Sequence, residues 1–158
     1  FIPPQKGRKH ILYIIRELID FQPESSTTDI TKALQYFTNV IKKRSTAFLI
    51  SDFIDDNLSQ DALTIANRKH DLVAFQIYDR RDAELPDVGL IKMKDAETGE
   101  RLWVDTSSRK VRMMYKNIWD ERRLRLQQMI SKAGVDSVTM EASEDYVKAL
   151  MRLFKMRT

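Results

Sequence analysis

Two oxygen-bearing side chains, on Thr28 and Asp52, hold the positions in this sequence that best suit a metal ion. Thr28 stands where a loop meets the start of an expected helix, and Asp52 is the first residue after a short apolar run, residues 46–51. A hydroxyl and a carboxylate are hard oxygen ligands of the kind that Mg²⁺ and Mn²⁺ prefer. The same residue types also favour caps, so Thr28 as a helix N-cap and Asp52 as a turn cap form the alternative interpretation.

A second group of residues is basic and aromatic and falls on one long expected helix. It comprises Arg109, Lys110, Arg112, Lys116, Arg122, Arg123 and Arg125, with Tyr115 and Trp119 between them. Such a group could bind phosphates or stack on bases, which makes a nucleic-acid-binding module the alternative function. We prefer a solvated helix face, because the cations are spread around the helix and Asp120 and Glu121 interrupt them. The core stripe of that helix would then be Val111, Tyr115, Ile118, Leu126, Met129 and Ala133.

No set of residues makes a credible catalytic site, and we predict that the chain is not an enzyme. His10 and His70 each lack a second His or Cys at metal-ligand spacing, so we interpret them as surface or capping residues. A haloacid-dehalogenase-type site needs a second Asp two residues after Asp52, where Ile54 stands. Asp79 either lines the same edge as Asp52 or anchors the charged loop that follows it. The sequence contains neither a Gly-rich phosphate loop nor a nucleophile elbow.

The stretch that must position Asp52 reads RSTAFLISDFIDD, residues 44–56. Its apolar middle, residues 46–51, predicts a strand buried on both faces of a parallel sheet. Basic residues (Lys42, Lys43, Arg44) precede this strand, and acidic residues (Asp52, Asp55, Asp56) follow it. Because ligands of open α/β sheets gather outside the carboxyl ends of the strands, Asp52 is the first candidate for chemistry.

Around this strand the sequence alternates between helical and extended patterns. Helices are expected over residues 10–21, 28–42, 59–69 and 110–133, and from a cap at Ser143 toward the end of the chain; further strands are expected over 71–77 and 137–141. The first helix carries an apolar stripe wide enough to pack on more than one side. The last helix is expected to turn Tyr146, Val147, Leu150, Met151 and Phe154 toward the core.

An alternating segment, residues 88–94 and 101–105, surrounds Ala96-Glu97-Thr98-Gly99 and predicts a β-hairpin. The whole pattern predicts an α/β fold with a parallel sheet and right-handed crossovers. We expect a single domain over residues 1–158 with the hairpin inserted at about 88–105.

The composition is that of a globular protein, with 42% hydrophobic and 32% charged residues. The 158 residues suffice to bury one core. With 0 Cys there is no disulfide framework, which fits a reducing compartment, and we expect a cytoplasmic location. No apolar stretch approaches membrane-spanning length. The net charge of +4 permits an anionic partner without requiring one.

Several segments resemble a known family: IPPQKG (2–7), IIREL (14–18), TTDITKAL (27–34), FLISDF (48–53), ELPDVGL (84–90), DAETGE (95–100) and VDTSSRKVR (104–112). In this order they are similar to the bacterial domain-of-unknown-function family fifty-eight. That family is related to von Willebrand factor A domains and is commonly encoded beside MoxR-type AAA+ ATPases. The resemblance implies a Rossmann-like von Willebrand A fold and a protein-interaction module whose partner is a MoxR-type ATPase or its client.

The resemblance also implies a metal-ion-dependent adhesion site that binds Mg²⁺ or Mn²⁺. Such a site combines an Asp-x-Ser-x-Ser loop, a Thr at a helix start and an Asp after a later strand. By motif, Thr28 matches the Thr and Asp52 matches the last Asp. The sequence departs from the pattern, because it lacks Asp-x-Ser-x-Ser and has Thr27 where the family usually has Gly. We therefore expect an incomplete site in this chain, with no tightly bound ion.

The beginning of the chain suggests a truncated fold. The first residue is Phe1, and the prolines that follow resemble the tail of a strand entering a turn. In the resembled fold the first strands would precede this point, and one of them would pair with residues 46–51. Without it, that strand would keep an open edge, which invites pairing with another chain. We therefore expect self-association, or a missing half that covers the edge.

Overall fold

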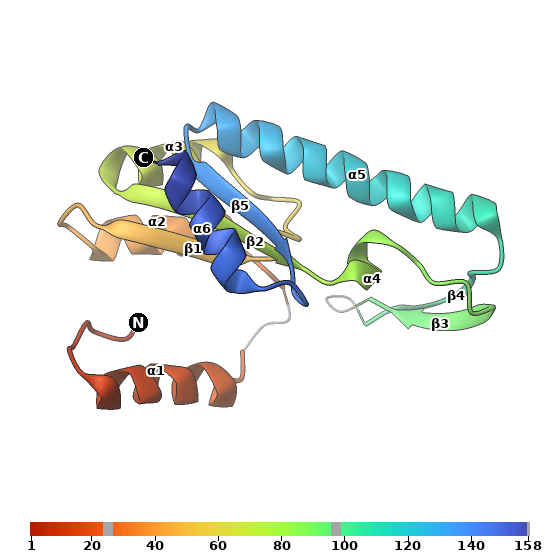
Figure 1. Ribbon diagram of the computed structural model, residues 1–158, viewed down its shortest axis with the longest axis horizontal. Helices are drawn as coiled ribbons and strands as arrows, with labels where there is room; N and C mark the ends of the chain where they lie inside the picture. Colours follow the sequence, from red (N-terminus) through yellow and green to blue (C-terminus); the bar gives the residue numbers. More distant parts are fainter. Residues whose placement is uncertain (24–26, 96–98, 158) are drawn as a thin grey trace.

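The computed structural model describes residues 1–23, 27–95 and 99–157, and Figure 1 shows the order of its elements. The helices are α1 (Arg8–Asp20), α2 (Ile30–Val40), α3 (Gln60–Lys69), α4 (Arg80–Ala83), α5 (Arg109–Lys132) and α6 (Tyr146–Met156). The strands are β1 (Thr46–Ser51), β2 (Asp71–Tyr78), β3 (Leu90–Lys94), β4 (Arg101–Asp105) and β5 (Asp136–Glu141). The chain is therefore of mixed α/β structure, as the alternating pattern predicts. The short helix α4 lies where the sequence indicates only a charged loop.

Within the described residues, β1, β2 and β5 form one parallel sheet in that order. Helices α2, α3 and α5 cover one face, where the buried cluster contains Ile30, Leu34, Leu63, Ala66, Leu72, Ala74, Ile130 and Val135. Helix α6 covers the other face, with Val73, Phe75, Val138, Met140, Ala149 and Leu153 in its cluster. In Figure 1, α5 runs along one side of the sheet and α6 crosses in front of it. The sheet thus lies between two helical layers of unequal extent.

The prediction that residues 46–51 are buried on both faces is wrong. β1 lies at the edge of the sheet and alternates between exposed and half-buried residues. Phe48 and Ile50 are 45% and 63% exposed, because α6 packs over β2 and β5 and leaves β1 uncovered. The strand that is buried on both faces is its neighbour β2, whose residues from Leu72 to Gln76 are all buried.

Two helices bury less apolar surface than their sequences indicate. In α6 the core residues are Ala149 and Leu153, with Leu150 packed against them. Tyr146, Val147, Met151 and Phe154, which were expected to face the core, are exposed. Helix α1 lies apart from the sheet in Figure 1 and has no buried residue, although its apolar stripe predicts packing on more than one side.

Helix ends follow local capping chemistry, although two caps fall elsewhere than expected. Ser59 caps α3 by accepting from the Ala62 amide at 3.3 Å, as predicted. Asp29, not Thr28, caps α2, and Asp145, not Ser143, caps α6. A carboxylate accepts an amide proton at least as well as a hydroxyl, and each Asp stands nearer the first helical residue. Gly134 ends α5 with φ of 67°, as its position predicts.

The predicted hairpin is present: β3 and β4 pair antiparallel, with Leu90 opposite Asp105. Its expected turn residues Ala96, Glu97 and Thr98 lie outside the described residues. In Figure 1 the hairpin and α4 lie beside the first half of α5, away from the parallel sheet. Thr106 fixes the base of the hairpin: its buried Oγ1 accepts from the Val88 amide at 3.1 Å and donates to Gly89 O at 2.7 Å.

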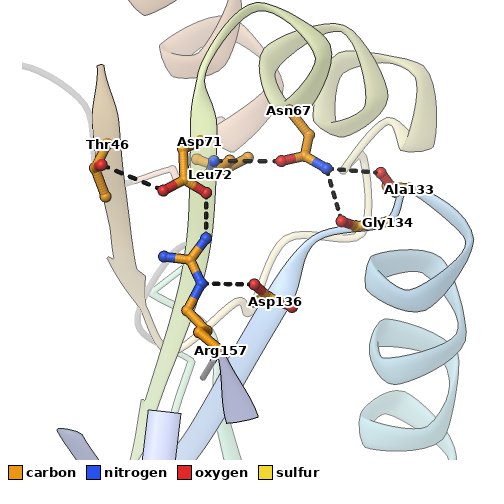
Figure 2. A network of polar contacts seen from close by, with 8 residues as sticks. All are labelled: Thr46, Asn67, Asp71, Leu72, Ala133, Gly134, Asp136 and Arg157. Carbon is orange, nitrogen blue, oxygen red and sulfur yellow. Dashed lines mark hydrogen bonds and ion pairs between the residues drawn. The ribbon is translucent and has the colours of Figure 1, made fainter. Parts of the chain in front are cut away.

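The amino end of the parallel sheet is fastened by the polar network of Figure 2. Arg157, directly after α6, donates to Asp136 Oδ2 from Nε at 2.8 Å and to Asp71 Oδ1 from Nη2. Thr46 donates to the other oxygen of Asp71 at 3.2 Å. One guanidinium therefore joins the end of α6 to the first residues of β2 and β5, and Asp71 extends the connection to β1.

Candidate functional site

The loops that carry Thr28 and Asp52 meet at the carboxyl end of β1. The Ile30 amide, at the start of α2, donates to Asp55 Oδ2 at 2.8 Å. Thr31 Oγ1 donates to Asn57 O at 3.0 Å and accepts from the Ser59 amide at 2.9 Å. These bonds hold the start of α2 against the loop after β1. The two sequence-predicted metal ligands thus belong to segments that the fold brings together, and both side chains are exposed.

The carboxylate of Asp52 is held by its own loop. Ser51 Oγ donates to Asp52 Oδ1 at 3.3 Å, and the Ile54 amide donates to the same oxygen at 3.2 Å. The Phe53 amide in turn donates to Ser51 Oγ at 3.0 Å, and Gln76 Nε2 donates to Asp52 O at 3.4 Å. Both hydrogen bonds that the described residues give to this carboxylate end on Oδ1. Oδ2 therefore remains the oxygen best suited to an incoming ligand.

Phe53 gives this loop its shape. Its φ of 59° lies in the left-handed region, which is unusual for a bulky residue, and its side chain is buried. A conformation of this kind costs of order 1–3 kcal/mol and persists only where the surroundings impose it. The burial of the ring and the hydrogen bond to Ser51 supply that constraint. Phe53, the strained residue, directly follows Asp52. Backbone strain of this kind tends to gather at functional sites.

The other carboxylates near Asp52 already have structural roles. Asp55 accepts from the Ile30 amide and, at 2.8 Å, from the Asn57 amide. Asp29 caps α2, and Asp56 lies 3.8 Å from Arg122. Among the residues that the structure describes, no three His, Asp or Glu side chains converge as a metal site. The Thr28 hydroxyl and the Asp52 carboxylate are both hard oxygen donors, the kind that Mg²⁺ and Mn²⁺ prefer.

A cleft of about 230 Å³ opens beside Asp52, between the loop after β1 and the middle of α5. The residues around it include Asp52, Phe53, Ile54, Asp55, Asp56, Leu58, Gln76, Asp82, Tyr115, Ile118, Trp119, Arg122, Arg123, Arg125, Leu126 and Met129. One wall is thus acidic and the other carries arginines and aromatic rings. No local pattern in the sequence indicates this cleft, because its two main walls, residues 52–58 and 115–129, lie more than 50 residues apart in the chain. The one available signal was the polar residues that follow β1 and β2.

The aromatic residues of this wall are fixed in place. The Trp119 ring lies 5.4 Å from the Tyr78 ring, centroid to centroid. Tyr115 donates its hydroxyl to Arg81 O at 3.2 Å. Burial raises the pKa of Tyr115 above its ordinary value of 10.0, the Asp82 charge raises it further, and Arg122 opposes both. Tyr115 is therefore a neutral hydrogen-bonding group at any physiological pH.

Two cations of the predicted basic and aromatic group contact the segment between β2 and β3. Lys116 lies 3.1 Å from Glu84 Oε1, and Arg112 lies 2.9 Å from Asp87 Oδ2. These cations hold α5 to the segment between β2 and β3, and Tyr115 and Trp119 are half-buried. The geometry favours a structural role over base stacking. The expected core stripe is partly correct: Ala133 is buried, whereas Ile118 is 51% exposed.

The remaining candidates have local roles. His70 is completely buried against the Phe37 ring, with Nδ1 3.3 Å from Ser45 Oγ, so it is not a surface residue. It is the C-cap of α3, where its amide donates to Ala66 O at 2.9 Å, as the capping alternative predicted. Its place between α3 and β2 leaves it no route to solvent. Asp79 caps α4 by accepting from the Arg81 amide at 2.7 Å, which is the anchoring role of the two proposed for it. No helix in the described part of the chain is long and apolar enough to cross a membrane.

Comparison with known proteins identifies the family. A family model described as "Protein of unknown function DUF58" matches residues 1–125. The chain belongs to the DUF58 family. This confirms the family that its segments resemble.

Relatives of the chain include uncharacterised mycobacterial proteins. An uncharacterised Mycobacterium avium protein, MAV169, is 25% identical over 160 residues, covering 99% of this chain and 93% of the relative. The uncharacterised proteins Rv1480 of Mycobacterium tuberculosis and Mb1516 of Mycobacterium bovis are each 30% identical over 100 residues. Those 100 residues are 62% of this chain but only 32% of the relatives, so the chain spans a minor part of their length. No solved structure matches the chain.

Proposed function

We propose that this DUF58 chain is a non-catalytic protein-interaction module of von Willebrand factor A type. Its docking site is the carboxyl edge of the sheet, where a divalent cation, Mg²⁺ or Mn²⁺, is held by Asp52 and Thr28. The observation that carries the proposal is the meeting of the α2 start with the loop after β1, through the Ile30–Asp55 and Thr31–Asn57 hydrogen bonds. It puts the two hard oxygen donors on adjoining segments.

A bound cation would link this chain to a carboxylate of the partner. The protein residues prepare the position. Ser51 and the Ile54 amide hold Asp52 Oδ1, and the left-handed Phe53 fixes the direction of the loop. Asp55 keeps the segment before α2 in place. Two protein ligands are few for Mg²⁺, so water and the partner complete its coordination.

The cleft beside Asp52 supplies the rest of the docking surface. Its volume of about 230 Å³ is sufficient for one large apolar side chain of the partner. Trp119 and Tyr115 form an apolar wall, and Arg123 and Arg125 at the rim suit a second acidic residue. By its family resemblance, the partner is a MoxR-type AAA+ ATPase or a client of one. The proposal places both proteins in the cytoplasm.

Manganese binding tests the metal site directly. Mn²⁺ titration followed by electron paramagnetic resonance should show a site, and Asp52→Asn should lower its affinity for Mn²⁺ by about tenfold or more. Tenfold is the smallest loss expected when only an outer-shell partner of a metal ligand is changed, so the loss of a ligand should be at least as large. Asp56→Asn is the matched control, because it removes another exposed carboxylate from the same loop. Likewise Thr28→Val should weaken the site and Thr27→Val should not. Equal effects of Asp52→Asn and Asp56→Asn would mean diffuse attraction to an acidic loop, and would refute the proposal.

A further inference from the structure

The two faces of the β3–β4 hairpin differ in exposure. Residues that lie opposite each other in the hairpin direct their side chains to the same face, and successive residues along a strand alternate between the faces. One face carries Ile91, Met93 and Val104, which are half-buried, and Leu102 near the turn, which is exposed. The other face, which we call the outer face, is exposed throughout and consists of Leu90, Lys92, Lys94, Arg101, Trp103 and Asp105.

The outer face is predominantly basic. The ion pairs among the described residues involve none of Lys92, Lys94 and Arg101. Its acidic member, Asp105, lies at the base of the hairpin, where its carboxylate accepts from the Ser107 amide at 3.0 Å and from the Ser107 hydroxyl at 2.6 Å. The three cations therefore form a positively charged surface that suits an anionic partner.

An exposed tryptophan lies among these cations. Trp103 is 60% exposed, and Leu90 on the same face is 63% exposed. Lys92 lies opposite Trp103 in the hairpin and holds its ammonium 5.6 Å from the centre of the ring, a cation–π contact. Tryptophan together with lysine and arginine is the combination that proteins place at the surface of a bilayer, where the ring lies at the level of the headgroups and the cations contact anionic lipids.

The hairpin is positioned to present its outer face to a large surface. In Figure 1 it lies at the end of the molecule toward which β2 runs, past α4 and away from the parallel sheet. Thr106 fastens its base by donating to Gly89 O at 2.7 Å. Asp95 and Glu100 continue the hairpin by one pair, since the Asp95 amide donates to Glu100 O at 2.8 Å. By the same alternation these two acidic residues belong to the opposite face, so they leave the outer face basic.

We propose that the outer face of the hairpin binds the surface of a membrane that contains anionic phospholipids. The size of the face favours a membrane over a folded protein. Its strands are 5 residues each and cover roughly 16 Å by 10 Å, far below the 800 Å² or so per partner of a specific protein interface. A bilayer presents anionic headgroups at every position, so a small face suffices: Trp103 enters the headgroup layer while Lys92 and its neighbouring cations contact phosphates.

A nucleic acid also presents phosphates, but Trp103 is less suited to stack on a base. Stacking uses the face of an aromatic ring, and the Lys92 ammonium already lies over the ring of Trp103. Entry into the headgroup layer keeps this contact, because the ammonium and the ring both belong at that depth. Membrane binding needs neither the cation at Asp52 nor the docking partner, so it is independent of the function proposed above.

Vesicle flotation in EDTA tests the charge of the outer face. The 158-residue chain should bind vesicles made of equal parts of phosphatidylglycerol and phosphatidylcholine, and it should not bind phosphatidylcholine alone. Lys94→Glu should lower the partition coefficient by about tenfold or more, because each cation near an anionic surface contributes about fivefold and this change reverses one. Lys148→Glu is the matched control: it makes the same change in net charge at an exposed position on α6 and should have a much smaller effect.

Tryptophan fluorescence tests the entry of Trp103 into the headgroup layer. Anionic vesicles should shift the emission of the wild type to shorter wavelength, and Trp103→Ala should abolish the shift and weaken binding. Leu102→Ala should change neither, because it shortens a side chain that is 69% exposed on the opposite face of the same strand. Trp103 and Leu102 are both exposed, so the two substitutions leave the core intact.

Three results would overturn the proposal. The first is a chain that does not bind the anionic vesicles. The second is binding that Lys148→Glu weakens as much as Lys94→Glu, or Leu102→Ala as much as Trp103→Ala, since the outer face would then not be the contact. The third is binding to a single-stranded thymidine oligonucleotide, but not to vesicles, that requires Lys94 and Trp103; this would assign the outer face to nucleic acid.

Discussion

Replacing Arg157 with Ala removes the connection between the end of α6 and the amino end of the sheet. The Arg157 guanidinium contacts Asp136 Oδ2 at 2.8 Å from Nε and Asp71 Oδ1 from Nη2 (Figure 2). Asp71 keeps its hydrogen bond from Thr46 in the variant, so the loss is confined to α6. Within the described residues α6 alone covers the second face of the sheet, so its attachment bears on the packing of Leu153 and Ala149.

The solvent exposure of the three charged side chains sets the size of the effect of Arg157→Ala on stability. The side chains of Arg157, Asp71 and Asp136 are 25%, 36% and 50% exposed, so water screens each ion pair in part. Pairs of this kind stabilise by roughly 0.5–1 kcal/mol each, and two of them give about 1–2 kcal/mol. For a domain of this size that corresponds to a fall in Tm of about 2–8 °C. Arg157→Lys should lie between, because an ammonium keeps the charge but cannot contact both carboxylates in the same way.

The effect of Arg157→Ala on the free energy of unfolding should depend on pH. The hydrogen bond from Arg157 lowers the pKa of Asp71 below its ordinary value of 3.8, its charge lowers it further, and partial burial opposes both. A carboxyl whose pKa is lowered in the folded state stabilises the protein above its unfolded pKa, and this stability is lost as the pH falls through the folded pKa. The difference between wild type and Arg157→Ala should therefore be constant near neutral pH and shrink below about pH 4.

Urea unfolding followed by tryptophan fluorescence measures these differences. Arg152→Ala is the matched control, since Arg152 lies on the same helix and makes a single exposed ion pair with Glu144 at 3.6 Å. That control should change the free energy of unfolding by less than about 0.5 kcal/mol. A double-mutant cycle of Arg157→Ala with Asp136→Asn isolates one pair. If Arg157→Ala unfolds like the control at pH 7, or if its deficit is undiminished at pH 3, the account of this network is incorrect.

Two further predictions concern buried polar groups. Burial lowers the pKa of His70 below its ordinary 6.5, and the Lys69 and Arg44 charges lower it further. The unfolded chain therefore binds a proton at this position more readily than the folded chain, so the free energy of unfolding should fall as the pH drops from about 6.5. In urea titrations at several pH values, His70→Leu should abolish that slope. Thr106→Val removes the two side-chain hydrogen bonds that fix Val88 and Gly89. It should cost about 2 kcal/mol and speed hydrogen exchange at the Val88 amide, whereas Thr106→Ser keeps the hydroxyl and should cost less than half as much.

The periodicity of the apolar residues predicts the helices and strands of this fold better than it predicts which elements pack against them. An apolar run indicates a strand, and both β1 and β2 contain one. The sequence contains no signal that tells a strand covered on two faces from one covered on a single face, so the roles of β1 and β2 were not distinguished. The same holds for α6, where an apolar residue such as Phe154 fits the helical stripe but lies beyond the area that the sheet provides.

The candidate site was likewise predictable from the sequence only in part. The choice of Asp52 rests on its place after a strand and that of Thr28 on its place at a helix start, and the family resemblance matches both. The cleft does not follow, because its second wall is Tyr115, Trp119 and Arg122 on α5, which reach it only after the long connection between β2 and β5. Local spacing carries no information about where that helix crosses. Cap identity was a smaller error of the same kind, since Thr28 and Asp29 are both suitable caps and only the backbone selects Asp29.

The two ends of the parallel sheet are built for different purposes. At the amino end, Arg157 joins α6 to β2 and β5, and Asn67 bonds Gly134 O at 2.7 Å and the Leu72 amide at 3.3 Å, so that charged and polar groups there are matched to one another (Figure 2). At the carboxyl end, Asp52 is exposed, and the left-handed Phe53 stands next to it. The amino end has an exception of its own, since the buried Nε2 of His70 has no hydrogen-bond partner among the described residues. The left-handed backbone of a bulky residue, however, lies at the carboxyl end. Strained backbone tends to persist at binding and catalytic sites, so Phe53 is a physical reason, separate from the family resemblance, to propose the docking function at the carboxyl edge.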